Sequence, residues 1–146
     1  MEGLTGTRFG SAFVIMNGVP NSPINRYHQV EDTLIENNTI INGSHIELAG
    51  GSDAERSAVP KTTRFINNLV YNANGEDPFT IHDDISGITF DGNVQNELAG
   101  FKISQGFSSQ KVKLTRQANG LLMPADGSLK GIGVKPGLKV LDKAST

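Results

Sequence analysis

Three stretches of this chain repeat one short pattern, and that pattern decides the fold. They read Thr33-Leu-Ile-Glu-Asn-Asn-Thr-Ile-Ile-Asn42, Thr63-Arg-Phe-Ile-Asn-Asn-Leu-Val-Tyr-Asn72 and Ile88-Thr-Phe-Asp-Gly-Asn-Val-Gln-Asn96. Each has a short apolar strand, an Asn-Asn or Gly-Asn corner, a second strand and a closing asparagine. The corner residues Asn38, Asn68 and Asn93 recur at a spacing typical of repeat architectures.

β-rich units of this length predict an all-β fold, a right-handed parallel β-helix in which one repeat forms one coil. Stacking coils about 4.8 Å apart would pair every strand with the coils above and below it. Asparagine suits such corners because it tolerates left-handed backbone geometry and its amides can bond along a stack. The alternative is a small antiparallel sandwich with Asn-rich turns. In the β-helix, we expect one continuous core built from Leu34, Ile40, Phe65, Val70, Ile88 and Val94.

The composition excludes several classes of function. The 146 residues favour one domain, and a net charge of −2 gives no reason to expect nucleic-acid binding. No apolar run approaches the roughly 18 residues needed to span a membrane. The chain has no cysteine, so it has neither a disulfide framework nor a thiolate metal site. Its first residues lack the basic and apolar regions of a signal peptide.

The repeats predict about three complete coils, preceded by a strand at 12–16 and followed by an irregular segment. Further strands are expected at 45–48 and 79–82, and strand-like alternation continues at 101–104 and 111–114. We therefore predict a partial β-helix over residues 1–125 and an irregular tail over 126–146. The proline-rich loop 19–27 and the polar loop 49–60 should project from one side of the stack.

These two loops hold the first candidate binding residues, because repeat proteins place insertions on a binding face. The pairs are Arg26 with Tyr27 and Glu55 with Arg56. Guanidinium groups bind carboxylates, and a tyrosine ring can lie under a sugar, so together they suit an acidic polysaccharide. His82, followed by two aspartates, could belong to a metal site or a His–Asp dyad. A hydrogen-bonded histidine on the outer face is the plainer interpretation, since no metal-ligand spacing such as His-Glu-x-x-His occurs.

Four longer motifs carry a more specific resemblance. They are Leu4-Thr-Gly-Thr-Arg-Phe9, Ile15-Met-Asn-Gly-Val-Pro-Asn-Ser-Pro-Ile-Asn-Arg-Tyr27, Gly51-Ser-Asp-Ala-Glu-Arg-Ser-Ala-Val-Pro60 and Asp77-Pro-Phe-Thr-Ile-His-Asp-Asp-Ile-Ser-Gly-Ile88. Over roughly residues 3–125 the chain resembles polysaccharide lyase family six, the chondroitinase-B-like group that includes alginate lyases. The resemblance implies cleavage of uronate-containing glycans, most of all alginate, by β-elimination. It also implies a calcium ion that neutralises the uronate carboxylate, a lysine base and an arginine acid partner.

The chain departs from the family pattern at the chemical residues. The resemblance places the calcium ligands in a Glu-x-Glu strand, the base in Asn-Lys-Ser and the arginine in Leu-Arg-His-Gly, and none of these occurs here. The chain therefore resembles the C-terminal part of the lyase β-helix, with catalytic groups expected upstream of Met1. We expect no catalytic residue, no metal ligand and no bound calcium in this chain, and no activity from the chain alone.

The residues left to the chain are those expected to face the substrate: Arg8, Arg26, Tyr27, Glu55 and Arg56, with His82 weaker. Arg26 and Arg56 would pair with substrate carboxylates, Tyr27 would stack on or bond to a sugar ring, and Glu55 would hold Arg56. A non-catalytic β-helical module that binds acidic polysaccharides is the alternative. A third hypothesis is edge-to-edge self-association through bare strands. The parent protein would be secreted or periplasmic.

Overall fold

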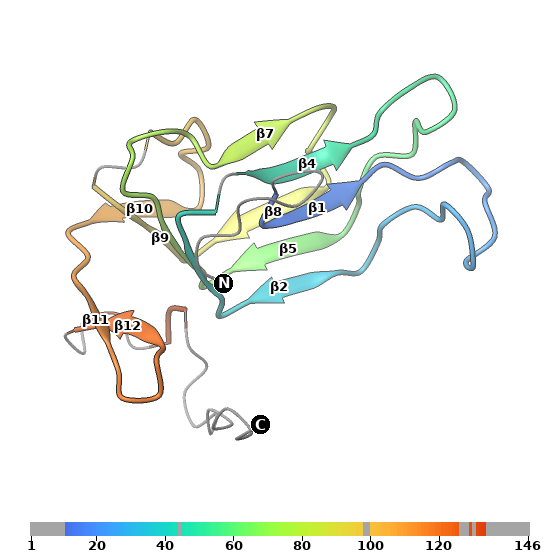
Figure 1. Cartoon of the computed structure of the whole chain (residues 1–146). Coiled ribbons are helices and arrows are strands. Elements are labelled where there is room, and N and C mark those ends of the chain that lie inside the picture. The colour runs from blue at the N-terminus through green and yellow to red at the C-terminus, as the bar shows by residue number, and fades with distance from the viewer. Residues whose placement is uncertain (1–10, 44, 98–99, 126–128, 130, 134–146) are drawn as a thin grey trace.

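The computed structural model describes residues 11–43, 45–97, 100–125, 129 and 131–133. The described residues form strands but no helix, and the strands run as rungs of stacked coils (Figure 1). The bounds of the strands in the coils are β1 Phe13–Met16, β2 Leu34–Glu36, β3 Thr39–Ile41, β4 Ile46–Gly50, β5 Thr63–Ile66, β6 Leu69–Tyr71, β7 Phe79–Ile81, β8 Ile88–Asp91, β9 Asn93–Asn96 and β10 Phe107–Gln110.

The strands pair between coils rather than within them. They make three sheets, β1-β4-β7, β2-β5-β8 and β3-β6-β9-β10, and every pairing in these sheets is parallel. Strands β2–β4 and β5–β7 are two full coils, while β8 and β9 supply the described strands of a third. This topology confirms the parallel β-helix and excludes the antiparallel sandwich.

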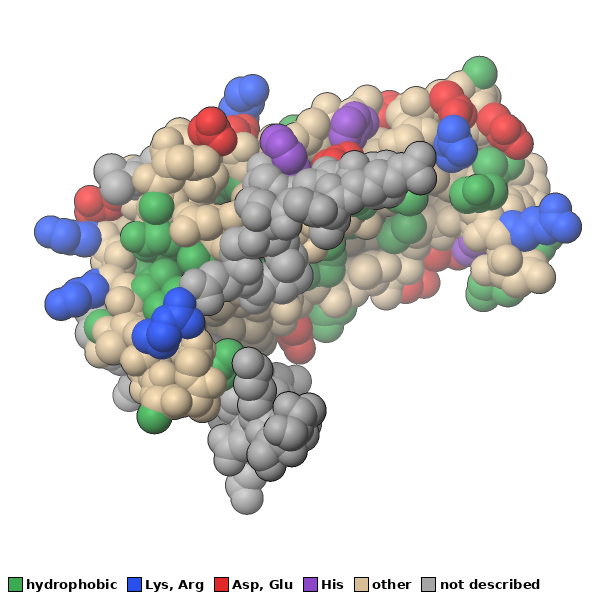
Figure 2. Space-filling view, in the orientation of Figure 1, with side chains coloured by type: hydrophobic (Ala, Val, Ile, Leu, Met, Phe, Trp, Pro, Cys, Tyr) green, Lys and Arg blue, Asp and Glu red, His purple; other side chains and the backbone are tan. Residues whose placement is uncertain are grey.

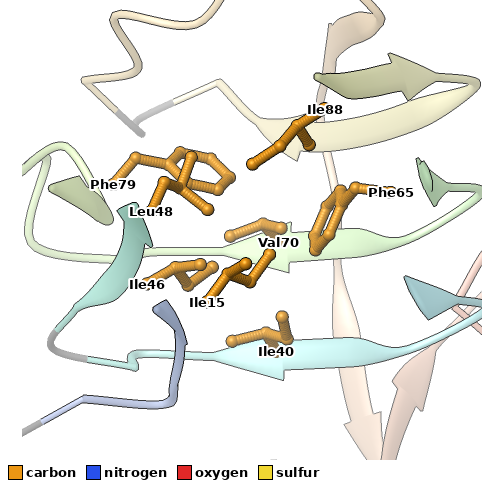
Figure 3. Packing of buried hydrophobic residues seen from close by; sticks show 8 residues of the cluster. All are labelled: Ile15, Ile40, Ile46, Leu48, Phe65, Val70, Phe79 and Ile88. Carbon is orange, nitrogen blue, oxygen red and sulfur yellow. The ribbon is translucent and has the colours of Figure 1, made fainter. Parts of the chain in front are cut away.

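The core lies inside the coils, and Phe65 is one of its fully buried members (Figure 3). The Phe65 ring lies 6.2 Å from the Phe13 ring, 6.1 Å from Phe79 and 5.8 Å from Phe90, centroid to centroid. Such offset and edge-on aromatic contacts add to the free energy gained from burying apolar surface.

Two of the expected core positions differ in the structure. Leu34 is 44% exposed and points outward, because Ile35 pairs with Phe65 and takes the inward place. Because Leu34 and Ile35 are both apolar, the sequence does not decide which of them points into the core. A shift of one residue along a strand moves every side chain to the opposite face of the sheet. Val94 is buried, but it packs with Leu69 and Leu129 in a second cluster, so the core is not continuous as predicted.

The corner between the second and third sheets is the ladder of asparagines that the repeats predicted. The Asn38 side-chain amide donates to Asn68 Oδ1 at 3.0 Å, and the Asn68 amide donates to Asn93 Oδ1 at 3.1 Å. The left-handed residues are not these but their predecessors, Asn37 (φ 55°), Asn67 (φ 53°) and Gly92 (φ 61°). The first residue of each pair, asparagine or glycine, makes the turn, and the asparagine after it supplies the amide.

The C-terminal part differs from the predicted strand positions. Residues 101–104 are not a strand, although Phe101 and Ile103 pack against the core. The strands lie later, as β10 and as an antiparallel hairpin of β11 (Leu114–Arg116) and β12 (Leu122–Pro124). Leu129 and Ile132 pack with Leu69 and Val94, so this segment covers the outer side of the β3-β6-β9-β10 sheet. Most of the predicted tail, 126–146, lies outside the described residues.

Candidate substrate-binding surface

The long loops that follow β1 and β4 project from the same end of the sheets (Figure 1). The backbones of Gly18 and Ala58 bond to each other in both directions at 2.9 Å. The Gln29 amide donates to the Val59 carbonyl at 2.7 Å. Figure 2 shows charged and hydrophobic side chains gathered at this end of the molecule. The loops therefore form one surface, as predicted from their lengths.

Among the cationic side chains of that surface, Arg56 is oriented by a hydrogen bond, an ion pair and a ring contact. Its Nε donates to the Gly51 carbonyl at 2.9 Å, and its Nη2 pairs with Asp53 Oδ2. Its Cζ lies 5.9 Å from the centroid of the Tyr27 ring, within the range of a cation–π contact. We call Asp53, Arg56, Tyr27 and the Gly51 carbonyl the Arg56 cluster. It joins the two loops through side chains and leaves Nη1 unbonded among the described residues.

The carboxylate that holds Arg56 was predicted wrongly. The sequence predicts that role for the adjacent Glu55, but the ion pair is made by Asp53, three residues before the arginine. Asp53 Oδ1 also accepts hydrogen bonds from the backbone N–H groups of Glu55 (3.0 Å) and Arg56 (2.6 Å). An Asp at the start of a tight turn bonds the backbone two or three residues on, and this signal was present in Ser-Asp-Ala-Glu-Arg.

Arg26 and Tyr27 lie on the exposed part of the first loop. The Val19 N–H donates to the Tyr27 carbonyl at 2.7 Å, and the Arg26 N–H donates to the Pro23 carbonyl at 3.0 Å. These bonds close the loop, while the Tyr27 side chain stays 60% exposed. The loop thus presents Arg26 and Tyr27 in a fixed backbone frame. Arg8, the remaining arginine of the prediction, lies outside the described residues.

His82 lies apart from the Arg56 cluster, directly after β7. Its Nε2 is 3.1 Å from Glu47 Oε2, and the Ser11 hydroxyl donates to the other oxygen of Glu47. The hydrogen bond from Ser11, and then that from His82, hold the pKa of Glu47 below its usual range. The partner of His82 is therefore Glu47 on the preceding coil and not the adjacent Asp83. This fits the hydrogen-bonded outer-face histidine favoured from the sequence.

Asp83 instead ties the loop after β4 to the end of β7. It accepts from the Ser52 hydroxyl at 2.7 Å and from the buried Asn17 amide at 2.9 Å. Together with a bond from the Asp84 N–H, these contacts keep the pKa of Asp83 below its usual range. Sequence reasoning missed Asp53, Glu47 and Asp83, because each acts across a turn or between coils.

The described residues do not fit a calcium site. They contain no group of three or more His, Asp or Glu side chains arranged to hold a metal ion. Ca²⁺ normally takes six to eight oxygen ligands. No step of the chemistry is therefore assigned to a metal held by the residues that the structure describes. Those residues also contain no helix long and apolar enough to cross a membrane.

Comparison with known proteins agrees with this architecture. The family model for chondroitinase B matches residues 1–140. The chain is similar to the solved structure of AlyGC, a PL6 family alginate lyase, with 51% sequence identity and a TM-score of 0.87. A mutant of that enzyme gives the same values. No curated protein matches the chain.

The similarity covers 94% of this chain but 19% of the AlyGC chain. The chain thus spans about a fifth of the solved lyase that it matches. From the family match along almost its whole length, and from its β-helical coils, the chain belongs to the chondroitinase B family, the PL6 polysaccharide lyases.

Proposed function

We propose that this chain supplies part of the substrate groove of a lyase that cleaves uronate-containing glycans, alginate foremost, by β-elimination. The observation that carries the proposal is the Arg56 cluster, in which a guanidinium held by Asp53 lies over the ring of Tyr27, the residue that follows the exposed Arg26. The solved relative with 51% identity is an alginate lyase, which supports a polyuronate as the ligand.

The chemistry of the loop surface suits this ligand. Each uronate residue carries one carboxylate, and Arg56 is already oriented by Asp53 and the Gly51 carbonyl. A pre-organised guanidinium loses less side-chain entropy on binding than a mobile one. The exposed Tyr27 ring offers an apolar face to a sugar, and Arg26 offers a second charge one residue away. We assign carboxylate binding to Arg26 and Arg56 and ring contact to Tyr27.

The groups that move protons are proposed to lie outside this chain. Its sequence has no Glu-x-Glu, Asn-Lys or Arg-His, and its described residues do not fit calcium. The contribution of this chain is to bind and orient the glycan. Its parent is expected to act outside the cytoplasm, where the polymer is found.

Binding and turnover test this proposal separately. Isothermal titration with hexamannuronate should show saturable binding, and Arg56→Ala should weaken it about tenfold, the value of one charge-assisted hydrogen bond. Lys111→Ala, a change of an exposed lysine outside the loops, is the matched control and should bind normally. Equal binding by the Arg56→Ala variant and the original chain would refute the proposed groove.

Turnover is followed as ultraviolet absorbance of the new unsaturated uronate during incubation with alginate and calcium. We expect none from the chain alone. Clear turnover by the purified chain would show that the catalytic groups lie within it.

A non-catalytic polyuronate-binding module is the second candidate. It is favoured by one observation, namely that the Arg56 cluster is complete within this chain and needs no metal. The coding sequence on the 5′ side of Met1 separates the two. Lyase motifs there in frame would support the lyase, and their absence would support the binding module.

A further inference from the structure

We propose that the outer face of the β2-β5-β8 sheet holds a second binding site, which takes an uncharged, hydroxyl-rich sugar ring. A shallow cavity of about 390 Å³ opens on this face, within the range of small-molecule sites. Its lining residues are Asp32, Thr33, Leu34, Thr62, Arg64 and Thr89. None of them belongs to the Arg56 cluster, and the proposal does not depend on the proposed lyase function.

The parallel register assembles this cavity. Leu34 pairs with Arg64, and Arg64 pairs with Thr89, so the three form one row across neighbouring strands. Neighbouring strands are about 4.8 Å apart, which places the three side chains side by side on the outer face. The row therefore offers an apolar surface, a guanidinium and a hydroxyl in immediate succession.

The edge of the cavity is built from an unusual backbone. Asp32 (φ 52°) and Thr62 (φ 47°) are both left-handed, and for a β-branched residue such as threonine this conformation is strained. Each stabilises the other, because the Thr62 hydroxyl donates to Asp32 Oδ1 at 2.7 Å and accepts from the Asp32 N–H at 3.0 Å. Strained residues held in this way cluster at binding sites.

Several polar groups that line the cavity have hydrogen-bonding capacity that no described residue uses. The Arg64 guanidinium makes no hydrogen bond or ion pair to any residue that the structure describes, although Asp32 lines the same cavity. Asp32 Oδ2 and the Thr89 hydroxyl likewise have no partner among those residues. A carboxylate and a guanidinium on one side of a cavity can accept from and donate to adjacent hydroxyls of a sugar. Leu34, 44% exposed, can contact the apolar C–H face of the ring.

The charge around the cavity argues for an uncharged ligand. The charges of Asp32 and Arg64 cancel within the lining. The charge of the neighbouring Lys61 is neutralised by Glu31, since Lys61 Nζ lies 2.7 Å from Glu31 Oε2. Asp91 lies two residues beyond Thr89 along β8, exposed on the same outward face by strand alternation. A polyanion would meet net negative charge here, whereas a neutral sugar would not. This distinguishes the cavity from the arginine-rich loop surface.

The test is chemical-shift mapping on the ¹⁵N-labelled chain with three neutral hexasaccharides and one anionic partner. The neutral probes are β-1,4-linked mannohexaose, β-1,4-linked cellohexaose and α-1,4-linked maltohexaose. The anionic probe is hexamannuronate, which matches mannohexaose in linkage and ring and differs by its carboxylates. We expect saturable shifts of the Thr33, Arg64 and Thr89 amides with at least one neutral probe. Hexamannuronate should shift these amides less.

Variants of the lining sharpen the result. Arg64→Ala should weaken neutral binding about tenfold, whereas Arg64→Gln, which keeps a planar N–H donor without charge, should weaken it about threefold at most. Thr89→Val keeps the shape of the side chain and removes its hydroxyl, so it should also weaken binding. Lys111→Gln is the control away from the cavity, and unchanged spectra elsewhere show that each variant folds.

Two results would overturn the proposal. One is the absence of saturable shifts on this face with all three neutral probes. The other is binding of hexamannuronate alone, lost equally in Arg64→Ala and Arg64→Gln, which would identify a carboxylate site instead. Neither result bears on hexamannuronate binding by the Arg56 cluster, so failure here and failure of the proposed groove can be told apart.

Discussion

Two corners of the same coil are built in opposite ways. The corner between β2 and β3, repeated between β5 and β6, is a tight turn whose asparagines bond through every coil. The corner that follows β1 and β4 carries long loops, 17–33 and 51–62, which are exposed over much of their length. The first corner fixes the spacing of the stack, and the second presents the Arg56 cluster.

The difference shows that, within one repeat, the asparagine corner contributes to stability while the loop corner carries the residues proposed to bind substrate. Asn68 makes bonds on both sides of its side chain, since Oδ1 accepts from the Asn38 N–H and Nδ2 donates to the Ile35 and Ile66 carbonyls. In the loop corner, the bonds of Asp53 and Asn17 orient a surface cation and the loop that carries it. A change at one corner should therefore have little effect on the property governed by the other.

The largest expected effect is at the ladder. Asn68→Ala should lower the free energy of unfolding by about 3 kcal/mol, because it leaves several buried backbone and amide groups without partners. Asn25→Ala, in the exposed loop, should change it by less than about 0.5 kcal/mol. Urea denaturation of both variants measures the contrast, and similar losses would abolish the division between the corners.

A smaller loss is expected where the ladder turn uses glycine. Gly92 has φ 61°, and a Cβ there would lie 2.4 Å from Asn67 Oδ1. Gly92→Ala should cost about 2 kcal/mol, part from the left-handed backbone and part from this contact. Gly120→Ala, at φ 83° with nothing within 4 Å, carries the backbone cost alone and should lose about 1 kcal/mol. Thermal unfolding of the Gly92→Ala and Gly120→Ala variants measures the difference in stability that is due to the contact with Asn67. Equal losses in the two variants would mean that the Asn67 side chain moves away without cost.

In the loop corner, the effect should appear in binding rather than stability. Asp53→Asn removes the ion pair to Arg56 and should weaken hexamannuronate binding about threefold, with the melting temperature nearly unchanged. Glu55→Gln should have a smaller effect, since Glu55 does not hold Arg56. Titration calorimetry of the two variants decides between these carboxylates, and a larger loss from Glu55→Gln would restore the original assignment.

The smallest effect is the response of this loop to acid. Bonds from the Arg56 backbone, the Glu55 backbone and the Arg56 side chain hold the pKa of Asp53 below its ordinary value of 3.8. A lowered folded pKa means that the ionised form favours the ordered loop above pH 3.8. This contribution is lost as the pH falls through the lower folded pKa. The Arg56 and Glu55 amide resonances should shift in that window, while those of Asn68 and Asn93 stay constant.

The ladder corner could be predicted from the sequence because its signals are local and repeat. An Asn-Asn or Gly-Asn step between apolar strands specifies a turn wherever it occurs, and Asn38, Asn68 and Asn93 align as expected. Which residues of a strand face the core was harder to predict, since Leu34 and Ile35 are both apolar and either could point inward. The strand at 107–110 was missed because Phe-Ser-Ser-Gln lacks alternation and forms by pairing with β9.

The binding surface could be predicted in outline but not in its contacts. Arg26, Tyr27 and Arg56 stand out as charged and aromatic residues in long loops. The partner of Arg56 depends on how one turn folds, and the partner of His82 comes from the coil below, 35 residues earlier. The cavity at Arg64 joins six residues from three separate stretches between Asp32 and Thr89, so no single stretch of sequence contains it.

The ladder also has a defined last step. Phe107 takes the place opposite Asn93 in the parallel register, and the Asn93 amide donates instead to the Phe65 and Gly106 carbonyls. A benzene ring has no amide to offer a following layer, and here it joins the rings of Phe79, Phe90 and Phe101. The number of coils that the asparagine ladder can join is thus limited by the residue at this position. A duplicated coil inserted at residue 63 would find asparagine amides to bond with on both sides, whereas the same coil inserted after residue 107 would find no amide partner.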